Sequence, residues 1–182
     1  MTQLFRARLN PELRYHSARH TTTVVRVAHE LALACRLRRA AHERLLLAAW
    51  FHDTGYVECY DGHEEVSQRL LEEFLRQENY AADFVSPHLI AVTHKSATPT
   101  DLPSELLKDA DMNNLGTSRY FEATANLRYE LAQMQGQKYT DAEWHRHCVQ
   151  FMEGHRYYSV VGAAKFGQQK AANLASLRGQ TV

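Results

Sequence analysis

The sequence predicts an all-α fold, and three observations support this class. Apolar residues recur at helical spacing in most segments, while no stretch shows the sustained alternation and β-branched enrichment of a strand. Only 8 glycines and 4 prolines interrupt the 182 residues. Hydrophobic residues make up 45% of the chain and charged residues 23%, a composition typical of a folded protein. At this length we expect a single compact multi-helix domain over residues 1–182.

Four helices are expected in the first part of the chain. In the first, Val24 and Leu31 belong to an apolar stripe, and the second stops at Gly55, which suits a helix C-terminus. The third follows a loop through Gly62, and in the fourth Pro87 is tolerable only in the first turn or at a kink. The expected ranges are about 15–37, 41–53, 63–79 and 83–95.

A loop over residues 98–102 separates these segments from four further helices. Pro103 suits the first turn of the fifth helix, and Gly116 marks its end. Thr140 followed by Glu143 is a capping-box signature, so the seventh helix should begin there. The expected ranges are about 103–110, 118–134, 140–153 and 157–177.

Charge and cysteine content limit the partners and the compartment. Lys plus Arg and Asp plus Glu are both 21, so there is no strong case for nucleic-acid binding. The three cysteines are an odd number without metal-knuckle spacing, so a disulfide framework is not expected and a reducing compartment is favoured. The longest apolar run, Leu45–Phe51, is far shorter than the roughly 20 residues that span a bilayer. We expect a cytoplasmic protein without a membrane partner.

Histidine and aspartate occur where a helix would direct them into the core. His20 lies four positions before Val24 on the apolar stripe of the first helix. His52 and Asp53 continue the apolar face of the second helix, and Asp111 ends the fifth. An unpaired buried carboxylate is strongly destabilising, and no basic partner shares its face, so a bound ion is a natural compensation. This set of side chains suits a divalent transition metal or Mg.

Three motifs resemble the H…HD…D signature of the HD-domain superfamily: Tyr15–His20, Phe51–Gly55 and Asp109–Asp111. The resemblance implies an all-helical, metal-dependent phosphohydrolase with its metal site between central helices. It covers a motif-bearing core of about residues 15–115, followed by C-terminal helices over about 117–178. Around Gly154–Ser159 the chain is also similar to small bacterial members of the superfamily. The implied ligands are His20, His52, Asp53 and Asp111.

The resemblance extends to further histidines. His63 and His94 look like the second-metal ligands of two-metal HD enzymes, with Asp53 best placed to bridge the two ions. The His-x-x-x-His opening is similar to that of cyclic-nucleotide phosphodiesterases, which implies that His16 is the general acid. The purine-clamping glutamine region of those enzymes is not found in this sequence, nor is the Gly-Tyr-Pro signature of cyclic-dinucleotide HD enzymes. Neither substrate therefore transfers to this chain.

Some of these residues have a simpler structural interpretation. His63 could be a polar residue at a helix start, and His16 a surface histidine at a helix N-terminus. Lys95 is a second candidate for the general acid. Three basic residues are candidates for binding substrate phosphate, although most such side chains are simply solvated: Arg19, Lys108 and Arg119. The other histidines are interpreted as surface, core or interface residues: His29, His42, His88, His145, His147 and His155.

We therefore expect hydrolysis of a phosphate ester in a nucleotide or another small phosphorylated metabolite. One or two divalent ions (Mn, Fe, Co, Ni, Mg or Zn) would polarise the phosphoryl oxygens and supply a metal-bound hydroxide for attack on phosphorus. Two alternatives stay open: a sensor that binds metal and nucleotide without turnover, and a di-iron oxygenase of the HD type. The sequence also leaves open a homo-oligomer.

Overall fold

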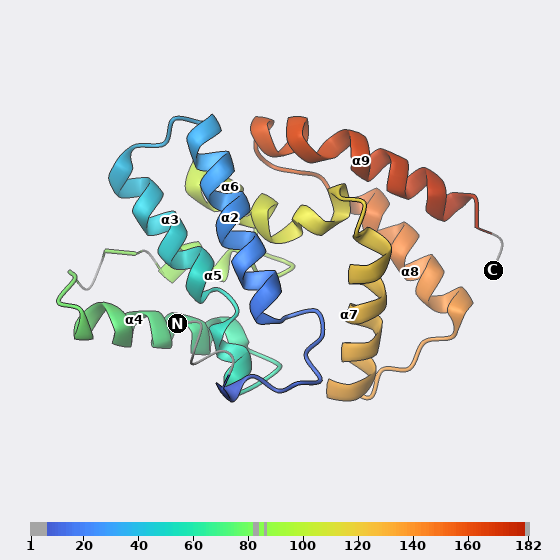
Figure 1. Ribbon diagram of the computed structural model, residues 1–182, viewed down its shortest axis with the longest axis horizontal. Coiled ribbons are helices and arrows are strands. Elements are labelled where there is room, and N and C mark those ends of the chain that lie inside the picture. Colours follow the sequence, from blue (N-terminus) through green and yellow to red (C-terminus); the bar gives the residue numbers. More distant parts are fainter. Residues whose placement is uncertain (1–6, 82–83, 86, 181–182) are drawn as a thin grey trace.

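The computed structural model describes residues 7–81, 84–85 and 87–180, and in these stretches the chain is helical without any strand (Figure 1). The predicted all-α class is confirmed. Two short 3-10 helices follow α3 and α6: η1 (Thr54–Val57) and η2 (Met112–Gly116). The α-helices are α2 (Ala18–Ala34), α3 (Arg39–Phe51), α4 (His63–Gln77), α5 (Pro87–Ala91), α6 (Leu102–Asp111), α7 (Tyr120–Met134), α8 (Asp141–Gly154) and α9 (Val160–Arg178).

The main apolar core lies where α2 packs against α3 and α6, in the left half of Figure 1. Val24 and Ala28 of the stripe predicted for the first helix are fully excluded from solvent. Leu45 of α3 and Leu106 of α6 are equally buried in the same cluster. Because the three helices meet along these faces, polar side chains placed on them converge inside the protein.

A second apolar cluster joins η2, α7, α8 and α9, in the right half of Figure 1. It includes the buried side chains of Tyr120, Trp144 and Met152. The η2 segment lies directly against α9, since a Cβ at Gly116 would be 2.5 Å from the Cβ of Phe166. Glycine therefore allows the chain to pass from the first cluster to the second at this point. No helix in the described stretches combines the length and apolarity of a membrane-crossing segment.

The fourth helix is shorter than predicted. It covers Pro87–Ala91 rather than 83–95, and residues 82, 83 and 86 lie outside the described residues. Beyond α5 the chain forms turns whose carbonyls bond to a side chain from α6 instead of continuing a helix. Lys108 Nζ donates hydrogen bonds of between 2.6 and 3.0 Å to three carbonyls, those of Val92, His94 and Ala97. Local periodicity contains no sign of this long-range contact.

The first helix also begins later than predicted, at Ala18 instead of about residue 15. Ser17 is its N-cap, and the hydroxyl of Ser17 accepts a hydrogen bond from the backbone of His20. The backbone N–H groups of Tyr15 and His16 donate instead to Glu130 Oε2 on α7, at 2.9 and 3.0 Å. A buried carboxylate from the C-terminal helices therefore holds the segment before α2.

Candidate metal centre

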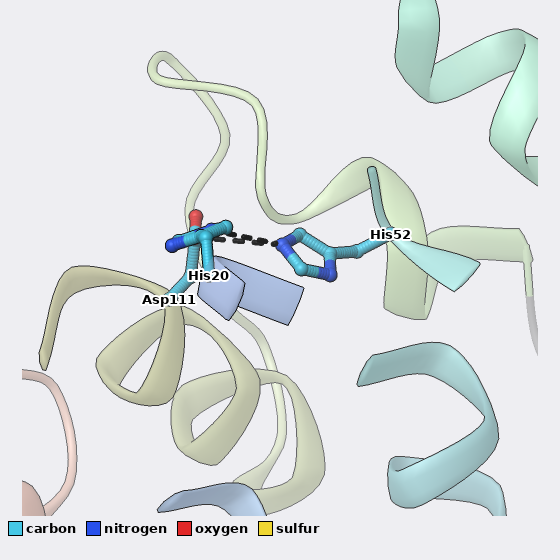
Figure 2. A group of neighbouring side chains, drawn as sticks. All are labelled: His20, His52 and Asp111. Atoms are coloured by element: carbon cyan, nitrogen blue, oxygen red, sulfur yellow. Dashed lines mark hydrogen bonds and ion pairs between the residues drawn. The ribbon is translucent and has the colours of Figure 1, made fainter. Parts of the chain in front are cut away.

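Three helices bring a histidine–aspartate group together at the edge of the main core. His20 comes from α2, His52 caps the C-terminus of α3, and Asp111 ends α6. His20 Nε2 lies 3.1 Å from Asp111 Oδ1 and 3.4 Å from His52 Nε2, and Figure 2 shows His52 directed at this pair. One ligand atom from each residue lies within 4.8 Å of the others, so this group could hold a metal ion.

Asp53 completes the group and provides a test of whether an ion fits. Its Oδ2 lies 3.3 Å from His20 Nε2 and 3.2 Å from His52 Nε2, but this buried oxygen accepts no hydrogen bond from the described residues. A buried carboxylate oxygen without a donor is costly. Two imidazole nitrogens and the Asp111 carboxylate, with the Asp53 carboxylate beside the nitrogens, are ligands suited to a divalent transition ion. The residues present therefore fit a metal.

Without an ion, the histidines and aspartates of the group stabilise one another's charged forms against the effect of burial. Burial disfavours protonated His20, but Asp111 and Asp53 outweigh this effect and raise its pKa to about 9. The same carboxylates raise the pKa of His52 well above its usual value, again against burial. Burial alone would raise the pKa values of Asp53 and Asp111, but His52 and His20 lower both. Metal binding must displace the protons from the two imidazoles.

The local backbone orients His52. Its Nδ1 lies 2.8 Å from the carbonyl oxygen of Ala49, to which it donates one α-helical turn back. This hydrogen bond fixes the ring and leaves Nε2 with its lone pair for the centre. Thr54 donates to the carbonyl of Phe51 at 2.7 Å, so the turn from α3 into η1 is held from both sides of Asp53.

A close backbone contact brings His63 to the same centre. Gly55 lies against the first residue of α4, where a Cβ would be only 1.9 Å from the carbonyl oxygen of His63. The Gly55 N–H also donates to Ser67 Oγ at 2.8 Å, which fastens η1 to α4. As a result, His63 Nε2 lies 3.7 Å from Asp53 Oδ1. The structure thus places His63 beside the residue proposed to bridge two ions.

A cavity of about 850 Å³ opens from this group. His94 and Lys95 line it as well, but both side chains are exposed. His94 Nδ1 bonds to Ser96 Oγ at 2.8 Å, and no ion pair joins it to Asp53 among the described residues. The structure therefore places His63 beside Asp53, whereas His94 and Lys95 are exposed residues of the cavity lining.

His16 has a partner that the sequence did not reveal. Its Nδ1 forms a short ion pair with Glu130 Oε1, and the Glu130 side chain is fully buried. Tyr60 donates to the same oxygen at 3.1 Å, and Tyr56 Oη lies 3.3 Å from His16 Nε2. Burial would raise the pKa of Glu130, but His16 and two backbone donors lower it. This carboxylate is therefore ionised and orients the His16 ring.

One sequence signal could have identified Glu130. It lies three positions after Leu127 and one before Leu131, both of which belong to the second apolar cluster. A carboxylate on the apolar face of a helix is the same signal that made Asp111 a candidate ligand. For Tyr56, whose ring stacks on His63 at 3.8 Å and on His16 at 4.4 Å, the sequence offers no comparable signal.

The three candidate phosphate-binding residues lie apart from the cavity lining. Lys108 uses its ammonium group on the backbone carbonyls after α5. Arg119 bonds to Glu122 at 2.6 Å, and Arg19 lies 4.0 Å from the same carboxylate. None of the three is among the described residues that line the cavity. The structure does not bring them to the histidine–aspartate group.

Asp109, which stands in the same motif as Asp111, has a different setting. Its carboxylate accepts hydrogen bonds from the N–H groups of Tyr158 and Ser159 at 2.7 and 2.8 Å, and from Ser159 Oγ at 2.6 Å. Ser159 is the N-cap of α9, and a Cβ at Gly162 would lie 2.2 Å from Asp109 Oδ2. Asp109 therefore fastens α6 to the start of α9.

The fold and the site define an all-α protein with a buried histidine–aspartate centre. The model of the HD domain family matches residues 17–112, which is more than half of the chain and includes His20, His52, Asp53 and Asp111. The chain therefore belongs to the HD-domain family. Members of this superfamily are mostly metal-dependent phosphohydrolases. The same comparisons found no match among curated proteins or solved structures.

Proposed function

We propose that the protein hydrolyses a phosphate ester of a small phosphorylated metabolite at a divalent ion held by His20, His52, Asp53 and Asp111. The observation that carries this proposal is the buried Asp53 oxygen, which lies between two imidazoles and lacks a hydrogen-bond donor. Membership of the HD family supports the same chemistry. A bound ion would polarise the phosphoryl oxygens and lower the pKa of a water molecule.

His16 is the proposed proton donor to the leaving group. Glu130 holds its Nδ1, while Nε2 lies 3.3 Å from Tyr56 Oη, and the His16 ring lines the cavity. A carboxylate at one imidazole nitrogen fixes the orientation of the ring. In the reaction, the water oxygen bonds to phosphorus, the bond from phosphorus to the leaving oxygen breaks, and His16 protonates that oxygen. Lys95 in the cavity lining is the alternative donor.

His63 and His94 are the proposed ligands of a second ion, with Asp53 shared between the two positions. The separation of 3.7 Å between His63 Nε2 and Asp53 Oδ1 supports the first assignment. His94 would have to turn from its bond with Ser96 to take part. With the ions in place, the carboxylate of Asp53 would keep the two sets of ligands at a fixed separation.

Metal removal tests the proposal. We expect protein treated with a chelator to lose hydrolysis of 4-nitrophenyl phosphate and bis(4-nitrophenyl) phosphate, and to recover it with Mn, Co, Ni, Mg or Fe. Cys148→Ser serves as a matched control, because burial raises the pKa of this cavity-lining thiol and makes it a poor nucleophile. Activity that persists without metal, or that Cys148→Ser abolishes, contradicts the proposal. Oxygen consumption by iron-loaded protein without phosphate release would favour the oxygenase alternative.

A further inference from the structure

The cavity beside the histidine–aspartate group has two kinds of wall. One part carries the polar residues of the candidate centre, including Asp53, His63 and Asp111. Another part is built by η2, α7 and α8 and consists mostly of apolar and aromatic side chains: Leu115, Tyr120, Leu127, Leu131, Trp144 and Phe151. A cavity of about 850 Å³ is in the range of roughly 300–1,000 Å³ that encloses organic ligands of moderate size. A phosphoryl group alone would leave the second wall uncovered.

Two leucines of α7 line the cavity in addition to packing against the second apolar cluster. Leu127 and Leu131 are one turn apart and therefore share a face of α7, and both are only partly buried. On α8, Trp144 is almost fully buried, with its ring nearly parallel to that of His147 at 5.4 Å. A ligand that covers the leucines removes apolar surface from water, which favours an apolar group at this position.

The charges of the lining oppose a polyphosphate. Among the described residues that line the cavity, Lys95 is the one lysine or arginine. Five carboxylates share this lining: Asp53, Asp61, Glu64, Glu65 and Asp111. Proteins that bind several phosphoryl groups use clusters of arginine and lysine or a cradle of backbone amides. One phosphoryl group at the metal needs no such cluster, whereas the further phosphoryl groups of a triphosphate would add negative charge to a lining that already carries Asp61, Glu64 and Glu65.

We propose that the site selects esters that carry a single phosphoryl group and an uncharged apolar organic group, which contacts Leu127 and Leu131. This inference rests on the proposed phosphohydrolase function. The reaction is the hydrolysis described above: water supplies the oxygen that bonds to phosphorus, and the apolar group leaves as its alcohol after taking one proton.

The apolar wall is tested with a series of n-alkyl phosphates from ethyl to octyl, whose leaving groups have nearly the same pKa. We expect KM to fall about threefold to fourfold for each added methylene until the cavity is filled, with little change in kcat. Leu127→Ala with Leu131→Ala should weaken this dependence, raising KM for octyl phosphate roughly 10- to 100-fold more than KM for ethyl phosphate. Leu174→Ala is the matched control, since Leu174 packs against the second cluster and is not among the described lining residues.

The charge argument is tested with AMP and ATP, which share a nucleoside and differ in the number of phosphoryl groups. We expect hydrolysis of AMP at a kcat/KM at least 10-fold above that for ATP. A preference for ATP, or a kcat/KM that does not change from ethyl to octyl phosphate, overturns the inference while the hydrolase function stands.

A failure of the proposed hydrolase function can be distinguished from a failure of this inference. If no ester is hydrolysed with any metal, the proposed function is wrong, and binding of ethyl- and octylphosphonate to the metal-loaded protein decides the inference separately. Tighter binding of octylphosphonate that the double leucine variant abolishes supports the apolar wall, and equal binding of both phosphonates overturns it.

Discussion

Asp109 and Asp111 lie two positions apart on α6, and both carboxylates are buried, but their neighbours differ. Asp109 accepts hydrogen bonds from two backbone N–H groups and one hydroxyl, which hold it in place without any ion. Asp111 faces the imidazoles of His20 and His52 beside Asp53, a carboxylate with an unsatisfied oxygen. The pKa of Asp109 is raised by burial, whereas that of Asp111 is lowered by the two histidines despite burial. Two buried aspartates in one motif thus have different surroundings: Asp109 is held by hydrogen-bond donors, and Asp111 faces histidines with which it could hold an ion.

The largest contrast is expected between Asp53→Ala and Asp109→Ala. Asp53→Ala should abolish metal binding and turnover and leave the helical fold intact, because its charge compensates an ion rather than a packing contact. Asp109→Ala should instead lower the free energy of unfolding by about 3 kcal/mol, because it leaves buried donors without an acceptor. Metal analysis, circular dichroism and denaturant unfolding of both variants measure this difference. Near-normal rates in Asp53→Ala would show that the central assignment is wrong.

The next largest effect is expected from the double change His63→Ala with His94→Ala. It should leave about one tightly held ion per chain and lower turnover by several orders of magnitude, because the two-ion arrangement assists both attack and departure. The number of ions bound per chain is measured after the protein is loaded with excess metal and desalted. If the unaltered protein and the double variant both hold one ion, His63 and His94 have substrate-binding or structural roles.

A smaller effect is expected at the proposed proton donor. His16→Ala should lower turnover by roughly 10²- to 10⁴-fold with unchanged metal content, as expected for the loss of a general acid. Glu130→Gln should give a smaller loss, because the ring of His16 remains but its charged partner does not. Rate measurements alongside metal analysis separate these roles. A loss of metal in His16→Ala would make this histidine a ligand instead.

The smallest expected effect is a pH dependence of the stability of the metal-free protein. The pKa of His20 is raised to about 9 in the folded chain, so its contribution to stability is fully present below about 6.5 and is lost as pH rises through 9. Chelator-treated protein should therefore lose stability between pH 6.5 and 9, while metal-loaded protein should not. Thermal unfolding across this range checks the sign, and proton release on metal addition at pH 7.5 provides a second measure. Constant stability of the metal-free protein would contradict the proposed charge balance.

The parts of the molecule that follow from local sequence were predicted well. The apolar stripe of α2 is buried as expected, and the capping box at Thr140 and Glu143 starts α8. The inward positions of His20, His52 and Asp111 follow from helical periodicity alone, and the structure brings these side chains together. The single-domain organisation and the catalytic roles stay predictions.

Features that depend on distant contacts could not be predicted. The end of α5 depends on the ammonium of Lys108, and the start of α2 depends on Glu130, more than 100 residues further along the chain. Periodicity in the segments themselves carries no trace of these partners. The same limit applies to the orientation of His16, which is set by α7 and not by its own neighbours in sequence.

The contact between Glu130 and His16 has a consequence for the synthesis of the chain. A ribosome makes every proposed ligand through Asp111 before it makes α7. A nascent chain at that stage contains the residues for binding an ion but lacks the carboxylate that orients His16. The proposed proton donor is therefore oriented only after all the proposed ligands have been made, and a product truncated before α7 would retain the candidate ligands without an oriented acid.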